Sequence, residues 1–159
     1  MSDLLWIMRH GEAAPGFPDH ERELTERGRQ EVARMAQWLA CQLDHLNVPR
    51  VVASPYRRAQ QTAAIIARRL GTPVTTLDCI TPDDAIETAI EWLQGQATQT
   101  PMLLVSHMPW VGVMTSRLTE GERAHGIGFP TAAIARLEAE VWAPGCATLR
   151  EFQTPGSLG

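Results

Sequence analysis

The sequence of 159 residues is long enough for one domain with a substantial core, and we expect a single domain over residues 1–159. Hydrophobic residues make up 44% and charged residues 20%, as in ordinary soluble globular proteins. The formal net charge of −4 argues against nucleic acid as a bulk electrostatic partner. The chain has no apolar run of the roughly 20 residues that a transmembrane helix requires, so we expect no membrane span.

The cysteines and the N-terminus indicate a cellular compartment. The three cysteines are odd in number and widely spaced, which favours a reducing compartment and provides no CxxC metal site. The N-terminus has no basic leader followed by a cleavable apolar segment. We therefore expect a cytoplasmic protein, and we expect it to be a monomer.

An apolar run near the N-terminus ends abruptly in polar side chains. Leu4 to Met8 is typical of a strand buried on both faces. Ligands of open α/β sheets bind at the carboxyl ends of such strands, where Arg9 and His10 fall. Gly11 permits a sharp turn directly after them. The sequence therefore predicts an anion site at this end, with His10 as a candidate for covalent chemistry.

Start signals followed by apolar residues at helical spacing predict several helices. These helices are expected to begin at Thr25, Ser54, Thr81 and Pro109. The apolar stripe of the first would run to Leu46, and Gly28 on the same face would allow close approach to the sheet. The second would end at Gly71, a common C-terminal signal.

The remaining apolar segments predict strands. They lie at residues 4–9, 50–53, 74–77, 102–107, 132–141 and 147–152. Alternation of strands with helices predicts an α/β fold, a three-layer α/β/α sandwich around a mainly parallel sheet. The last two strands, joined by a short turn, would form an antiparallel C-terminal edge. The proline- and glycine-containing segment 13–22 would be a loop over the strand ends.

Basic and imidazole side chains follow three of these strands. Arg9 and His10 end the first strand, Arg57 and Arg58 come shortly after the second, and His107 ends the fourth. If these strands are neighbours, two imidazoles and two guanidiniums meet at one edge of the sheet. Guanidinium forks match phosphoryl oxygens, and an imidazole can attack phosphorus as a nucleophile. The set therefore favours phosphate chemistry.

Two simpler interpretations compete with this one. A single histidine at a strand end is more often a structural hydrogen-bonding residue. A zinc site is less favoured, because nearby arginines repel a cation and no compact ligand spacing is present. The co-occurrence of both histidines with the arginines favours an anion pocket, and we expect no metal and no organic cofactor.

Four motifs resemble those of the histidine phosphatase superfamily, which includes the phosphoglycerate mutases, and they occur in family order. Arg9-His10-Gly11-Glu12 resembles the RHG signature. SPYRRAQQT at residues 54–62 resembles S-P-x-x-R-A-x-Q-T, which places the family arginine at Arg58 and not at Arg57. LTERG at 24–28 and SHMP at 106–109 resemble the L-T-x-x-G and second-histidine motifs.

The resemblance implies a phosphoglycerate mutase-like fold and a phosphatase with a phosphohistidine intermediate. His10 would be phosphorylated and then hydrolysed, with the other groups positioning and stabilising the phosphoryl group. The phosphoryl oxygens would be held by Arg9, Arg58 and His107. Further substrate contacts would come from Arg22, Gly11 and Met108.

The chain is short for this superfamily and resembles its compact SixA-type phosphohistidine phosphatases. The interval from Leu77 to Pro101 holds little more than one predicted helix, so the pocket should be open. Glu12, Asp83 and Asp84 are candidates for a general acid or an orienting group, but the usual acidic motif is not evident. The two aspartates also suit the first turn of a helix.

The lack of an evident general acid has a chemical meaning. An alkoxide leaving group needs a proton, whereas imidazole, which ordinarily titrates with a pKa of about 6.5, can depart already protonated. The expected substrate is therefore phosphohistidine in a protein, such as a histidine phosphotransfer domain. The alternatives are a small phosphorylated metabolite hydrolysed by a phosphomonoesterase and a phosphoprotein-binding module without activity. A mutase is less favoured because the clamping insertion is absent.

Overall fold

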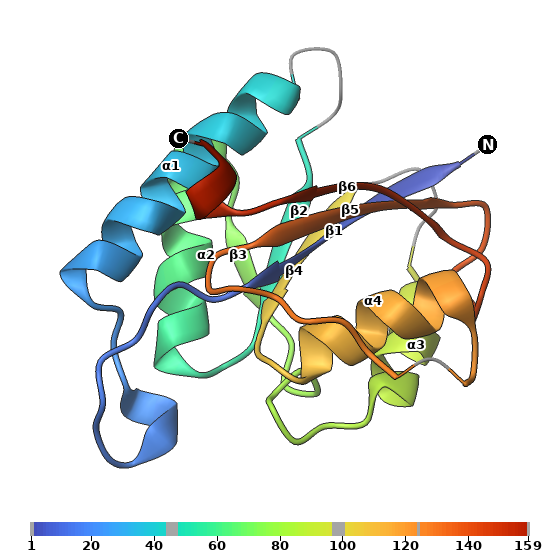
Figure 1. The fold of residues 1–159 in the computed structure, drawn as a ribbon, viewed down its shortest axis with the longest axis horizontal. Helices are drawn as coiled ribbons and strands as arrows, with labels where there is room; N and C mark the ends of the chain where they lie inside the picture. Colours follow the sequence, from blue (N-terminus) through green and yellow to red (C-terminus); the bar gives the residue numbers. More distant parts are fainter. Residues whose placement is uncertain (1, 44–47, 97–100, 124, 159) are drawn as a thin grey trace.

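The computed structural model describes residues 2–43, 48–96, 101–123 and 125–158 (Figure 1). The strands are β1 (Asp3–Arg9), β2 (Arg50–Ala53), β3 (Val74–Thr76), β4 (Met102–Ser106), β5 (Ile134–Ala139) and β6 (Thr148–Gln153). The helices are α1 (Glu26–Gln42), α2 (Arg57–Leu70), α3 (Ile86–Gln94) and α4 (Trp110–Glu120). Two 3₁₀ turns are η1 (Asp19–Glu21) and η2 (Pro155–Leu158). Every predicted strand is present, with small differences at the ends.

The strands form one sheet in the order β3-β2-β4-β1-β5-β6. The four strands from β3 to β1 are mutually parallel, whereas β5 is antiparallel to both β1 and β6. Helices α1 and α2 cover one face of the sheet, and α3 and α4 cover the other (Figure 1). This arrangement confirms the predicted α/β/α sandwich with an antiparallel C-terminal edge.

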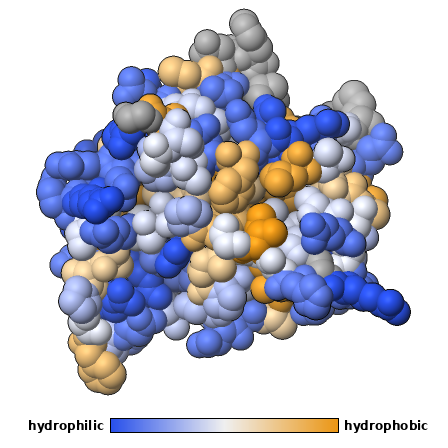
Figure 2. Space-filling view, viewed as in Figure 1, coloured by the Kyte–Doolittle hydropathy of each residue, from blue (hydrophilic) through white to orange (hydrophobic). Residues whose placement is uncertain are grey.

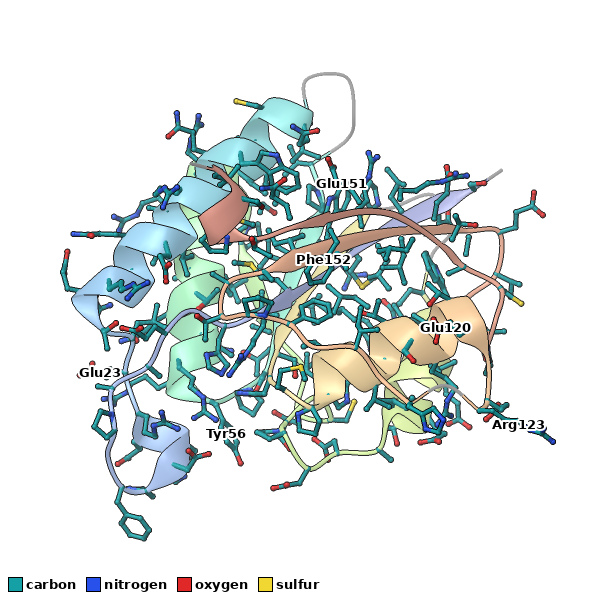
Figure 3. The ribbon with its side chains drawn as sticks, in the orientation of Figure 1. Glu23, Tyr56, Glu120, Arg123, Glu151 and Phe152 are labelled. Carbon is teal, nitrogen blue, oxygen red and sulfur yellow. The ribbon has the colours of Figure 1, made fainter. Side chains whose placement is uncertain are left out.

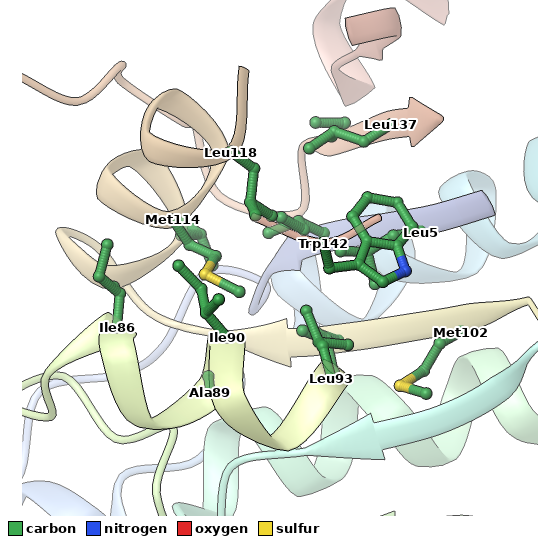
Figure 4. Close-up of a cluster of buried hydrophobic side chains, with 14 of the residues drawn as sticks. Leu5, Ile86, Ala89, Ile90, Leu93, Met102, Met114, Leu118, Leu137 and Trp142 are labelled. Atoms are coloured by element: carbon green, nitrogen blue, oxygen red, sulfur yellow. The ribbon is translucent and has the colours of Figure 1, made fainter. Parts of the chain in front are cut away.

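Alternating side chains of β1 supply both halves of the core. Leu5 and Ile7 belong to the cluster under α3 and α4, whereas Trp6 and Met8 belong to the cluster under α1 and α2. All four are at most 1% exposed, and full burial of each such side chain stabilises the fold by about 1.5–3 kcal/mol. Figure 4 shows Leu5 in the first cluster, together with Ile90 of α3. Burial on both faces explains why the strand is apolar throughout.

Helix α2 begins later than its sequence signal indicates. Ser54 is the predicted start, whereas the first helical residue is Arg57. The Ser54 hydroxyl accepts a hydrogen bond from the Tyr56 backbone N–H at 3.3 Å and lies 2.7 Å from Nε2 of His107. The local side-chain bond favours a turn over a helical residue. The turn brings Ser54 to the second histidine.

Helix α3 also begins later than predicted. It starts at Ile86, because the Asp84 carboxylate accepts hydrogen bonds from the N–H and hydroxyl of Thr81 at 2.8 and 2.7 Å and closes a separate turn. The expected inner residues Ile86, Ile90 and Leu93 are all buried. The apolar spacing therefore located the helix face correctly, although the start signal did not locate its first residue.

The start of α1 packs against the loop that follows β1. Thr25 caps the helix as predicted, since its hydroxyl oxygen accepts from the Gly28 N–H at 2.9 Å and donates to Oε1 of Glu12 at 2.7 Å. A Cβ at Gly28 would collide with the carbonyl oxygen of Glu12. The glycine therefore permits close approach to this loop and not to the sheet. Leu46, the predicted end of the stripe, lies outside the described residues.

Hydrophobic residues on the face shown in Figure 2 gather where the sheet meets α4, and hydrophilic residues surround them. Phe152 of β6, labelled in Figure 3, packs edge-on against Phe129 with ring centroids 5.0 Å apart. This contact holds in place the segment that enters β5. Within the described ranges, no helix is long and apolar enough to span a membrane.

Candidate active site

The predicted meeting of strand ends forms a pocket of about 350 Å³. Strands β1 and β4 are parallel neighbours with Arg9 in register with Ser106, so His10 and His107 emerge side by side. Their ring centroids are 5.2 Å apart. The pocket is lined by Arg9, His10, Glu12, Ala13, Asp19, Arg22, Arg58, Pro82, His107, Met108 and Thr131. The topology thus brings together the two histidines and the arginines that the sequence separates.

The hydrogen bonds of His10 fix the position of its ring proton. Nε2 lies 3.2 Å from Nε of Arg58, and it must accept this bond because a guanidinium can only donate. Nδ1 lies 2.7 Å from the carbonyl oxygen of Gly11, which can only accept, so Nδ1 carries the proton. The neutral ring therefore keeps a lone pair on Nε2, beside Arg58.

Backbone and hydroxyl contacts hold the turn after β1. The His10 N–H donates to the Ser106 carbonyl at 3.0 Å, and the Gly11 N–H donates to Oγ1 of Thr62 at 3.0 Å. That hydroxyl in turn donates to the Arg58 carbonyl at 2.8 Å. Thr62 is fully buried and so ties the turn to the first turns of α2. Its residue type is part of the sequence motif, but its role could be recognised only from these contacts.

Burial lowers the pKa values of both histidines. The pKa of His10 falls from 6.5 to about 4, mainly by desolvation, with nearby guanidiniums adding to the effect and the bond to Gly11 opposing it. The pKa of His107 falls to about 3, again mainly by desolvation and then by the charges of His10 and Arg58. Both rings are therefore neutral near pH 7, the form in which His10 is nucleophilic.

These pKa values predict that the protein loses stability as acid is added. In the unfolded chain both imidazoles would titrate near the ordinary value of 6.5, but in the fold they resist protonation down to about 4 and about 3. Between these pH values the unfolded chain binds more protons, so the free energy of unfolding falls as pH falls. We expect the urea midpoint to decrease from about pH 6.5 to about pH 3, and a constant midpoint would contradict the lowered pKa values of the two histidines.

His107 is held through one ring nitrogen only. Its Nε2 lies 2.7 Å from Oγ of Ser54, whereas its buried Nδ1 has no hydrogen-bond partner in the part of the chain that the structure describes. With the Ser54 hydroxyl donating to Nε2, the ring proton is on Nδ1, where an oxyanion could accept it. The ring of Tyr56, labelled in Figure 3, packs edge-on against His107 at 4.9 Å between centroids. In this tautomer, Nδ1 of His107 is available to donate to an anion bound in the pocket.

Arg58 presents its guanidinium in the first turn of α2, with a side chain that is only 6% exposed. Besides the bond from Nε to His10, Nη1 donates to the Asp19 carbonyl at 2.8 Å and Nη2 to Oδ2 of Asp19 at 3.2 Å. Arg57 lies on the outside, where its half-exposed side chain pairs with Glu23 at 3.7 Å. The structure therefore selects Arg58 for the pocket, and its fixed fork suits an oxyanion.

Asp19, which the sequence did not single out, provides a negative charge in this basic pocket. Its Oδ1 lies 3.0 Å from Nη1 of Arg22 and its Oδ2 lies 3.2 Å from Nη2 of Arg58. These partners, first of all the Arg22 hydrogen bond, hold the pKa of the carboxyl below its usual value. The ionised carboxylate thus bridges two guanidiniums that an incoming anion would use. No sequence signal pointed to this role, because Asp19 is one of several acidic residues in this segment.

Replacing Asp19 by asparagine is expected to tighten the binding of inorganic phosphate. The substitution keeps the shape of the side chain but removes a negative charge that competes for Arg22 and Arg58. Because the carboxylate is half exposed and screened, we expect the Kd to fall by roughly 3- to 10-fold. Isothermal titration calorimetry at matched ionic strength measures this, with Glu21→Gln, on the same loop, as the control. An unchanged or higher Kd would show that Asp19 does not compete with the anion.

Other predicted contact residues also lie at the pocket. Nη1 of Arg9 donates to the Phe129 carbonyl at 2.8 Å, while its Nε is buried without a partner among the described residues. Burial, and then the charge of Arg58, lower the pKa of Arg9. Met108 lines the pocket directly, and Arg22 does so while its Nε donates to the Ala14 carbonyl. Gly11 contributes through its backbone, as described above for the turn.

The acidic candidates divide into two groups. Glu12 lines the pocket, with its carboxylate accepting the Thr25 hydroxyl. Asp83 and Asp84 do not line it: Asp83 is exposed, and Asp84 is bound to Thr81. No cluster of three or more His, Cys, Asp or Glu suited to a metal ion is found among the residues that the structure describes. The expectation of a metal-free site stays a prediction.

Comparison with known proteins identifies the family. Residues 5–81 match the model of the histidine phosphatase superfamily, branch 1. Phosphohistidine phosphatase SixA from Escherichia coli (strain K12) is 35% identical over 138 residues, which cover 84% of this chain and 83% of that protein. The chain belongs to the histidine phosphatase superfamily. Its match to the superfamily includes the segments that carry His10 and Arg58.

Two solved structures illustrate the shared architecture. The protein histidine phosphatase SixA complexed with tungstate superposes with a TM-score of 0.87 and 32% identity, covering 98% of this chain and 99% of that one. A phosphoserine phosphatase from Entamoeba histolytica, complexed with 3-phosphoglyceric acid, has a TM-score of 0.70 at 19% identity, covering 96% of this chain and 97% of that one. The second likeness shows the fold alone, so the fold by itself does not determine the substrate.

Proposed function

We propose that this protein removes the phosphoryl group from phosphohistidine in a protein substrate, through a covalent phosphate on His10. The observation that carries the proposal is the protonation pattern of His10, a neutral ring with its lone pair on Nε2 inside an arginine-lined pocket. The relationship to phosphohistidine phosphatase SixA supports the substrate class. We further propose a monomeric, single-domain, cytoplasmic enzyme that needs no metal or organic cofactor.

The proposed reaction has two displacements at phosphorus. In the first, Nε2 of His10 forms a bond to phosphorus as the bond from phosphorus to the substrate imidazole breaks, and the leaving ring keeps its own proton. Arg58, which donates to Nε2 of His10 in the structure, transfers its Nε hydrogen bond to a phosphoryl oxygen. In the second, water attacks phosphorus, loses a proton to solvent and releases inorganic phosphate, which restores the neutral His10.

Three positive side chains would stabilise the transferring group. Arg9, Arg22 and Arg58 all line the pocket, and the unpartnered Nδ1 of His107 would donate a further hydrogen bond. Preorganised donors aimed at a transferring phosphoryl group act mainly by electrostatic stabilisation. Asp19 would move away from Arg58 as the phosphoryl oxygens arrive. Arg58 would then direct its guanidinium at the phosphoryl oxygens and no longer at a carboxylate.

The acidic residues support a P–N over a P–O substrate. Asp83 and Asp84 lie away from the pocket lining, and the lowered pKa of Asp19 keeps it ionised, so it is a poor proton donor near pH 7. Glu12 lines the pocket, but its Oε1 is engaged as an acceptor of the Thr25 hydroxyl at 2.7 Å. An alkoxide would leave slowly without a proton donor, whereas imidazole can leave as a neutral ring. We therefore place small phosphomonoesters second as substrates.

A direct comparison of substrates tests the proposed function. One enzyme preparation is given a protein phosphorylated on histidine, the same protein phosphorylated on serine, and a panel of small phosphomonoesters. We expect kcat/KM to be at least about 100-fold higher for the phosphohistidine protein, equivalent to about 2.7 kcal/mol. Faster turnover of a phosphomonoester would show that the protein is a small-molecule phosphomonoesterase. If it binds the phosphoprotein but releases phosphate from no substrate, it is a phosphoprotein-binding module.

A further inference from the structure

A second concave surface lies between α1 and α2, outside the catalytic pocket. It encloses about 640 Å³, and its floor is made by small side chains of both helices, Ala33, Ala36 and Ala64. Ala33 and Ala64 are exposed although they are apolar, and Ile65 beside them is only partly buried. The two helices pack side by side (Figure 1), and their alanines leave the space between them unfilled. We call this surface the α1–α2 groove.

The rim of the α1–α2 groove is positively charged. Arg29 of α1 and Arg68 and Arg69 of α2 line it, and no Asp or Glu does. None of these three arginines forms an ion pair in the described ranges of the chain, whereas Arg27 on the same helix pairs with Glu31. Arg68 and Arg69 also complement the C-terminal dipole of α2, but Arg29 lies near the start of α1 and has no such reason. The rim is therefore complementary to an acidic ligand.

The groove begins close to the catalytic pocket. Gln61 lines its near end, less than one helical turn after Arg58 on α2, and its amide oxygen accepts from the Leu24 N–H at 2.8 Å. From Gln61 to Arg69 the helix rises by about 12 Å, the length of roughly two helical turns. A ligand in the groove would thus lie alongside a substrate whose phosphoryl group occupies the pocket.

We propose that the α1–α2 groove binds an acidic helical segment of the protein that carries the phosphohistidine. The proposal rests on the proposed function. A helix with a small apolar stripe fits a concave floor of alanines, and its acidic side chains would reach the arginines on both rims. Nucleic acid fits less well, because the floor is apolar and the protein as a whole carries a net charge of −4.

Docking at this groove separates substrate binding from chemistry. Contacts made equally in the ground state and the transition state lower KM and leave kcat unchanged. Opposite charges on the two partners would also speed their encounter, an effect that salt screens. The groove should therefore affect protein substrates only. A small P–N compound such as phosphoramidate reaches the pocket without touching α1 or α2 beyond Arg58.

The test compares KM for a histidine-phosphorylated protein and for phosphoramidate across matched variants. Arg68→Glu and Arg69→Glu are each expected to raise KM for the protein at least about tenfold, the result of losing about 1.4 kcal/mol of binding, with kcat for the protein and both constants for phosphoramidate unchanged. Arg123→Glu is the control, because it makes the same change of charge away from the groove. Figure 3 shows Arg123 on the opposite side of the view from Tyr56, and we expect this variant to leave KM unchanged. Ala33→Trp, which fills the groove without changing charge, is expected to raise KM in the same way.

The outcomes separate this inference from the function on which it rests. If the unsubstituted enzyme releases no phosphate from the phosphohistidine protein, the proposed function fails. If it does, and KM is the same in Arg68→Glu, Arg69→Glu and Ala33→Trp, the docking site is overturned. Loss of binding to anionic vesicles or single-stranded DNA with an unchanged KM would overturn it as well. Unchanged phosphoramidate turnover serves as the check that each variant is folded.

Discussion

The His10→Ala variant is expected to release phosphate from a phosphohistidine protein at least about 10⁴-fold more slowly, the scale observed when an enzyme loses its nucleophile. The pocket contains a second imidazole, but Nε2 of His107 lies 2.7 Å from Oγ of Ser54. With the Ser54 hydroxyl donating to Nε2, the other ring nitrogen carries the proton, and His107 has no free lone pair with which to attack. Single-turnover release of phosphate by rapid quench measures the effect on chemistry alone. His10 is 7% exposed, so the alanine variant leaves a small cavity, and its affinity for inorganic phosphate checks that the pocket keeps its shape.

A matched histidine variant makes this result specific. His125 is exposed and does not line the pocket, so His125→Ala should keep full turnover. Wild-type affinity of His10→Ala for inorganic phosphate, within a few fold, would show that the pocket is intact. Residual turnover within tenfold of the wild type would mean that water attacks the substrate directly and that His10 is only a binding residue.

The Arg58→Lys variant is expected to lose about 10²–10³-fold in kcat, the usual effect of removing a preorganised donor to a developing charge. Lysine keeps the positive charge but has no planar fork, so it cannot hold Nε2 of His10 and two further acceptors together, as Arg58 holds Asp19. The measured quantities are kcat and KM for the phosphohistidine protein, together with phosphate affinity.

The neighbouring arginine is the control for this variant. Arg57 follows the same turn but is half exposed and pairs with Glu23, so Arg57→Lys should leave kcat unchanged. Such a surface substitution usually changes stability by no more than about 0.5 kcal/mol. Equal losses in the two variants would show that total charge, and not the fork of Arg58, supports catalysis.

The chemistry of the site was largely predictable because it follows from strand ends. Two buried strands each terminate in a histidine, and parallel pairing of β1 with β4 must bring these residues to one edge. The choice of Arg58 over Arg57 came from the family motif and not from local physics. The helical period of α2 supports it, because Arg58 shares its inner face with Thr62 and Ala59, which are fully buried.

Other features needed the tertiary structure. Ser54 and Asp84 both read as helix-start signals, but each side chain closes a local turn, and the helix begins later. Asp19 pairs with Arg58 across 39 positions of sequence, and neither its loop nor its composition indicates that contact. The α1–α2 groove likewise arises from alanines on two helices that sequence periodicity treats as separate surfaces. Long-range side-chain pairs of this kind are not encoded in any local pattern.

Localising the phosphate on the enzyme during turnover tests the covalent mechanism most directly. The enzyme is mixed with a ³²P-labelled phosphohistidine protein, quenched in alkali, where phosphohistidine is stable, and digested for mass spectrometry at a series of times. We expect label on Nε2 of His10 that rises before free phosphate and then disappears. Label on any other residue would contradict the covalent mechanism through His10. Release of phosphate in a single turnover, with no label on the enzyme at any time point, would contradict it as well.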